Sequence, residues 1–109
     1  MLLSAGALAQ GKQKVQEPSF REVQGTVTVS SGQPADRAVV QLKNTKSLQI
    51  ESFITDATGH YHFAGLSTDV EYELKADAQD MTSGWQTLSL FNSKKVVTIN
   101  LKLKKRRPV

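Results

Sequence analysis

The amino-acid sequence predicts an all-β fold, a sandwich of seven antiparallel strands. Apolar and polar residues alternate with a period of two in several short segments. Turn-forming Gly, Asp and Ser residues separate these segments at regular spacing, and no segment shows helical periodicity. This pattern is typical of a sandwich. The predicted strands cover residues 21–29, 37–44, 48–55, 60–64, 70–77, 85–91 and 97–103.

The alternation defines an inward face for most of these strands. It is clearest over residues 70–77, where apolar residues alternate with charged ones. In the first strand Gly25 falls on the inward face, which predicts a bulge or a close approach by a neighbouring chain. In the third strand the alternation leaves open whether Ile50 and Ile54 or Phe53 form the buried set.

The segment from Thr55 to Leu66 is expected to be a turn, a short strand and a second turn. Asp56 is placed to bond its own backbone two residues on, and Gly59 supplies the positive φ of such a turn. Tyr61 and Phe63 then point to the core. The opposite, solvated face carries the two histidines, His60 and His62.

Length and charge limit the class of protein. The chain has 109 residues, which suits one domain, and it has no cysteine, which excludes disulfides and thiolate metal sites. The net charge of +4 resides in the ends of the chain, because residues 15–101 carry seven basic and ten acidic side chains. A basic groove is therefore not expected, and nucleic acid is not an expected partner.

The sequence divides into four segments. Residues 1–9 are apolar and end in Ala7-Leu8-Ala9, which predicts a partial signal peptide. Residues 10–19 are predicted to be a disordered leader, residues 20–104 the sandwich and residues 105–109 a basic tail. We therefore expect a secreted, periplasmic or cell-surface protein. Membrane contact through the basic tail is the less favoured alternative to a solvated tail.

Trp85 is the one candidate ligand contact. It follows Ser83-Gly84 at a junction between loop and strand, where its ring could stack on a sugar. The alternative is a tryptophan that caps the core. The two histidines would need a third ligand to hold a metal, and none can be named. The loop acids Asp69, Asp77 and Asp80 are interpreted as solvated rather than as a calcium site.

Residues 20–104 resemble the carboxypeptidase regulatory-like domains, which have a transthyretin-like sandwich. The resemblance rests on an ordered set of motifs: Val23-x-Gly25-x-Val27, Gly32-x-Pro34, Ala38-x-Val40-x-Leu42, Thr55-Asp56-x-x-Gly59-x-Tyr61-x-Phe63-x-Gly65-Leu66, Tyr72-x-Leu74-x-Ala76 and Val97-x-Ile99-x-Leu101. It implies an immunoglobulin-like or prealbumin-like sandwich that is usually non-catalytic. The His-x-x-Glu element of zinc carboxypeptidases is absent. The chain also ends Lys105-Arg106-Arg107-Pro108-Val109, without the Tyr-Arg-Gly-Ser of transthyretin-fold hydrolases.

The resulting hypothesis is a non-catalytic, exported β-sandwich module with a structural or binding role. No catalytic residue, cofactor or metal is predicted, and the protein is not expected to be an enzyme. The expected partner is an unidentified protein or glycan. The alternative is a carbohydrate-binding module that uses Trp85 and nearby loops.

Overall fold

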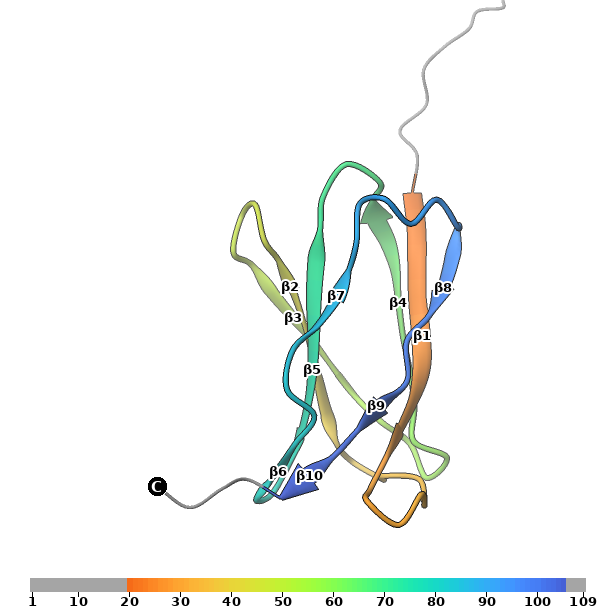
Figure 1. The fold of residues 1–109 in the computed structure, drawn as a ribbon, viewed down its shortest axis with the longest axis vertical. Coiled ribbons are helices and arrows are strands. Elements are labelled where there is room, and N and C mark those ends of the chain that lie inside the picture. Colours follow the sequence, from red (N-terminus) through yellow and green to blue (C-terminus); the bar gives the residue numbers. More distant parts are fainter. Residues whose placement is uncertain (1–19, 106–109) are drawn as a thin grey trace, which may run out of the picture.

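The computed structural model describes residues 20–105, which form short strands and no helix. The chain folds as a sandwich of two sheets, which confirms the predicted fold class (Figure 1). The predicted signal peptide and leader, and residues 106–109, lie outside the described residues. The strands are β1 (Phe20–Thr28), β2 (Val39–Asn44), β3 (Ile50–Ile54), β4 (His60–Ser67), β5 (Tyr72–Ala78), β6 (Met81–Thr82), β7 (Gln86–Leu88), β8 (Val96–Thr98), β9 (Leu101–Lys102) and β10 (Lys104–Lys105).

The two sheets differ in size. The four-stranded sheet has the order β4-β1-β8, and β9 also pairs with β1. The six-stranded sheet has the order β10-β6-β5-β2-β3, and β7 also pairs with β5. Neighbouring strands are antiparallel except for β8 and β9, which both run parallel to β1.

The last predicted strand, residues 97–103, is divided between the short strands β8 and β9, and a third short strand, β10, follows it. β8 and β9 pair with β1, and the chain then crosses to the other sheet, where β10 pairs with β6 (Figure 1). Leu101 and Leu103 stay buried throughout. Buried and exposed side chains therefore continue to alternate while the hydrogen-bonded neighbour changes from β1 to β6. The alternation in the sequence does not record which strand is the neighbour. Lys105, the first residue of the predicted tail, is paired with Met81.

Other elements also differ from their predicted bounds. The predicted strand 85–91 is reduced to β7, Gln86–Leu88, because the chain turns away after Leu88 toward the loop that Arg21 holds. Residues 78–84, which separate two of the predicted strands, contain β6, because β10 and β5 both supply backbone partners there. The predicted turn at Gly65 is instead a β-bulge inside β4, between the pairs Arg21–Leu66 and Val23–Phe63. Gly65 has a φ of +69°, and the bulge lets β4 continue to Ser67.

The core lies between the sheets. Phe53 packs on Phe63 across the sandwich, with ring centroids 6.0 Å apart. Ile50 and Ile54 are 51% and 60% exposed, so the structure selects Phe53 as the inward residue of the third strand. The buried apolar residues are Val23, Val27, Ala35, Ala38, Val40, Leu42, Tyr61, Phe63, Leu66, Tyr72, Leu74, Ala76, Leu88, Val97, Leu101 and Leu103.

The predicted turn before β4 is confirmed. The Thr58 amide donates a hydrogen bond of 2.9 Å to Asp56 Oδ1, and Gly59 has a φ of +76°. A Cβ at Gly59 would also overlap the carbonyl oxygen of Val27. Hydrogen bonding by the Thr58 side chain, with smaller contributions from the His60 and Thr58 amides, lowers the pKa of Asp56 below its usual value.

At Gly25 the backbone of β1 closely approaches residues 96–105, the segment that crosses from one sheet to the other and is called the crossing segment below. A Cβ at this position would overlap the carbonyl oxygen of Ile99, which explains the glycine. The Tyr61 hydroxyl donates a hydrogen bond to the same carbonyl oxygen. Tyr61 is fully buried, and burial raises the pKa of its phenol well above the usual value.

Candidate binding surfaces

Trp85 lies on the outer face of the six-stranded sheet. The β5–β7 register, continued by one residue, places Trp85 opposite Lys75. The ammonium groups of Lys75 and Lys43 lie over the indole, 4.8 Å and 5.2 Å from the ring centroid. These cation–π contacts connect the tryptophan to β5 and β2 and restrict its position. We call this surface, formed by Trp85, Lys43, Lys75, Glu73 and Asp77, the tryptophan face.

Each lysine of the tryptophan face also has a carboxylate partner. Lys43 Nζ lies 3.6 Å from Glu73, and Lys75 Nζ lies 3.5 Å from Asp77. The two positive and two negative charges balance, so the surface around the ring carries no net charge. Trp85 is 42% exposed and does not belong to the buried core. The arrangement therefore offers an aromatic surface to a flat, uncharged ligand.

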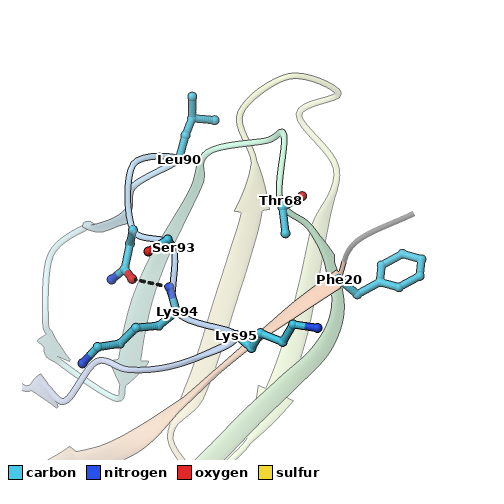
Figure 2. Close-up of a pocket in the computed structure, with 7 residues that line it drawn as sticks. Phe20, Thr68, Leu90, Ser93, Lys94 and Lys95 are labelled. Carbon is cyan, nitrogen blue, oxygen red and sulfur yellow. Dashed lines mark hydrogen bonds between the residues drawn. The ribbon is translucent and has the colours of Figure 1, made fainter. Parts of the chain in front are cut away.

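A second candidate surface lies at the end of the sandwich where β1 begins. A pocket of about 320 Å³ opens there, beside the loop that joins β7 to β8 (Figure 2). The Lys94 amide donates a 3.1 Å hydrogen bond to Asn92 Oδ1, and Lys95 extends toward Phe20 (Figure 2). The pocket is lined by Phe20, Thr68, Leu90, Asn92, Ser93, Lys94 and Lys95. We call it the end pocket.

The buried Arg21 organises this end of the molecule. Its guanidinium donates to carbonyl oxygens at the end of β4 and in two loops: Val70 at 2.7 Å, Ser89 at 2.8 Å, and Ser67 and Asn92 both at 3.3 Å. The side chain is 2% exposed. The sequence interpretation did not include Arg21, although its odd number places it on the same face of β1 as Val23. The alternation of inward and outward residues along β1 was therefore the one feature of the sequence that could have placed Arg21 on the buried face.

The same loops hold an exposed phenylalanine. Phe91 is 90% exposed and Leu90 is 40% exposed, next to the end pocket. The Phe91 amide donates to Ser89 Oγ at 3.0 Å, while the Ser89 carbonyl is held by Arg21. The loop is therefore fixed by internal hydrogen bonds on both sides of the exposed ring. The amino-acid composition alone does not predict that the Phe91 ring is exposed on this loop.

The residues weighed as metal ligands are not brought together. His60 is exposed, and His62 Nε2 lies 2.8 Å from Glu22 Oε1 on the outer face of the four-stranded sheet. Asp69 precedes β5, whereas Asp77 and Asp80 lie at its other end. Within residues 20–105, no group of three or more His, Asp or Glu side chains is arranged to hold a metal ion.

Comparison with known proteins identifies the family. The family model of the carboxypeptidase regulatory-like domain matches residues 22–104. The chain belongs to this family. The extent of the match confirms the resemblance seen in the strand and turn motifs. No curated protein matches the sequence.

A solved structure supports the fold of this carboxypeptidase regulatory-like domain. It is similar to catechol 1,2-dioxygenase from Acinetobacter sp. ADP1, inhibited by bound mercury, with a TM-score of 0.54 and 13% identity. The alignment covers 83% of this chain and 54% of the dioxygenase, so the chain spans about half of that enzyme. At this identity the likeness shows the fold alone. None of the described residues forms a helix suited to crossing a membrane.

Proposed function

We propose that this domain is a non-catalytic, exported binding module and that its contact surface is the tryptophan face. The observation that carries the proposal is the position of Trp85, 42% exposed on a sheet and held by two lysines. Aromatic side chains supply much of the binding energy at protein surfaces when they are rigidly presented. Membership of a regulatory-type family agrees with a binding role. The Ala7-Leu8-Ala9 pattern supports export.

The leading form of the proposal has a protein partner. Photo-crosslinking tests it, with a photoreactive residue introduced at Thr87, an exposed neighbour on β7. A matched probe replaces Thr98, an exposed residue on the other sheet. A partner captured from the cell envelope at residue 87 and not at residue 98 supports the proposal, provided that Trp85→Ala reduces capture. Capture that is equal at both positions would contradict it.

Carbohydrate is the second candidate ligand. The balanced charges around Trp85 favour it, because an uncharged sugar ring can stack on the indole without an unpaired ion nearby. A glycan array compares the wild type with Trp85→Ala and with Phe91→Ala, which removes an exposed aromatic elsewhere. We expect Trp85→Ala to abolish any glycan binding, because it removes the stacking surface, and Phe91→Ala to bind normally. Glycan binding that survives Trp85→Ala would exclude this candidate.

Catalysis is tested separately. Turnover of peptide, ester and ureide substrates by the purified domain should stay at the uncatalysed rate. Substantial turnover would contradict the proposal, whatever the binding experiments give.

A further inference from the structure

The β3 strand has an unpaired edge. β3 ends the six-stranded sheet, and no described residue pairs with its outer side (Figure 1). The amide of Thr55 donates to Ala38, and the carbonyl of Gln49 accepts from Asn44. Odd-numbered residues of this strand therefore direct their backbone groups toward β2. The amides and carbonyls of Ile50, Ser52 and Ile54 face outward.

The side chains of the same residues suit an interface. Ile50 and Ile54 pair with outer-face residues of β2, and both are more than half exposed. The strand contains no proline, lysine or bulge, which are the usual protections of an edge. The exposed side of β4 differs, because the bulge at Gly65 interrupts it. β3 is thus an unpaired edge that no bulge interrupts in the described chain.

We propose that β3 pairs with β3 of a second copy, antiparallel and about a two-fold axis through Ser52. In this register Ser52 pairs with its own mate, and Ile50 of one copy lies opposite Ile54 of the other. In each of the three pairs the two residues exchange backbone hydrogen bonds, because their amides and carbonyls point away from β2. The four isoleucines form one apolar strip on the outer face. The sequence of β3 can therefore pair with a second copy of itself, with isoleucine opposite isoleucine and serine opposite serine.

Charge selects the antiparallel orientation. Lys46 lies in the turn before β3 and Asp56 in the turn after it, and both are exposed. An antiparallel copy brings the Lys46 end of one strand to the Asp56 end of the other, whereas a parallel copy brings like charges together. Glu51 is the one charge within β3. It lies opposite Phe53 of the second copy and diagonal to its own mate, about 7–8 Å away.

The dimer would join two sheets into one continuous outer face. The two-fold axis of an antiparallel pair is perpendicular to the sheet, so both Trp85 side chains face the same way. Two tryptophan faces on one side would bind a repeated ligand with enhanced avidity. This consequence rests on the proposed function, whereas the dimer itself does not.

Sedimentation equilibrium of the full chain without ligand tests the dimer directly. We expect a concentration-dependent mass that approaches twice 12.0 kDa. Ile54→Lys should weaken self-association at least about tenfold, because a charged residue replaces the apolar pair. The matched control, Val96→Lys, alters an exposed aliphatic residue on β8 and should associate normally. A monomer at every accessible concentration, or a dimer that both variants preserve, would overturn the proposal.

Cysteine crosslinking tests the register and does not require the lysine variants to fold. The chain has no cysteine, so each introduced thiol is unique. Ser52→Cys should form a covalent dimer on oxidation or with a short bis-thiol reagent, since paired Cα atoms lie about 5.5 Å apart. Ile54→Cys alone should not, because its mate lies about 14 Å along the strand. A mixture of Ile50→Cys and Ile54→Cys should crosslink. Equal crosslinking by Ser52→Cys and Ile54→Cys alone would reject this register.

Discussion

Residues 96–105 pass from β1 to β6 on one side of the sandwich, whereas on the other side β3 ends the six-stranded sheet with outward backbone groups. We call these the closed side and the open side. On the closed side the crossing segment forms backbone hydrogen bonds with β1, and its residues Leu101 and Leu103 are buried. On the open side Ile50 and Ile54 stay exposed. We therefore expect substitutions on the closed side to change stability and substitutions on the open side to change self-association.

Gly25→Ala on the closed side should cost the most stability. The new Cβ would overlap the Ile99 carbonyl oxygen and approach the Tyr61 ring, so β1 and the crossing segment must separate. We expect a loss of about 3 kcal/mol in the free energy of unfolding, at the upper end for overpacking. The urea midpoint of the purified domain measures it.

Gly84→Asn is the matched control for that variant. Gly84 has a φ of +73°, but a Cβ there meets no atom within 4 Å. Asparagine tolerates this backbone region, so the loss should stay below about 1 kcal/mol. Equal losses in the two variants would mean that the close approach of Gly25 to the Ile99 carbonyl does not account for the cost of Gly25→Ala.

Arg21→Met is expected to have the next largest effect. It leaves carbonyl oxygens of two loops without their donor and should cost about 2–3 kcal/mol. Amide hydrogen exchange should rise in residues 67–71 and 89–95 more than in β3. Lys102→Met, which removes an exposed cation from β9, is the control. Uniform exchange across both sides would show that Arg21 acts on the whole fold and not on these loops.

Tyr61 gives the closed side a dependence on pH. Because burial raises the phenol pKa above its usual value of 10.0, the unfolded chain releases this proton at a lower pH than the folded chain. The contribution of the protonated phenol to stability is therefore fully present below about pH 10 and is lost as the pH rises above it. Tyr61→Phe should lose about 1 kcal/mol at pH 7, where the bond to Ile99 is missing.

The same variant should show a shallower decline of stability above pH 10. Urea unfolding at pH 7 and at pH 10.5 gives both quantities for the two proteins. An identical decline in wild type and Tyr61→Phe would assign the alkaline sensitivity to other groups.

The fold was largely predictable because the sandwich is encoded in short-range alternation. The inward residues of β1 and β5 and the Asp56–Gly59 turn follow from periodicity and backbone preference. The crossing of residues 96–105 does not, because alternation records which face is buried and not which strand accepts the hydrogen bonds. The bulge at Gly65 was mistaken for a turn because both require a positive φ.

The candidate surfaces were predictable only in part. Trp85 is recognisable as an aromatic residue at a loop junction, but its lysine partners come from β2 and β5, and only the sheet register brings them together. Arg21 resembles an ordinary charged residue at a strand end, and its four carbonyl partners come from the end of β4 and from two loops far along the chain. Loop conformation at that distance is set by tertiary packing rather than by local sequence.

The mildest change in stability is expected on the open side, at Leu48. Leu48 lies in the turn before β3, is 66% exposed and has a φ of +67°, a conformation that disfavours a branched side chain. Leu48→Gly should raise the free energy of unfolding by about 0.5–1 kcal/mol, since the relieved strain exceeds the added freedom of the unfolded glycine. Leu48→Asn should gain a similar amount without that added freedom. Thermal unfolding of dilute protein measures both, and a loss of stability in both variants would mean that the leucine side chain contributes to the open side through packing.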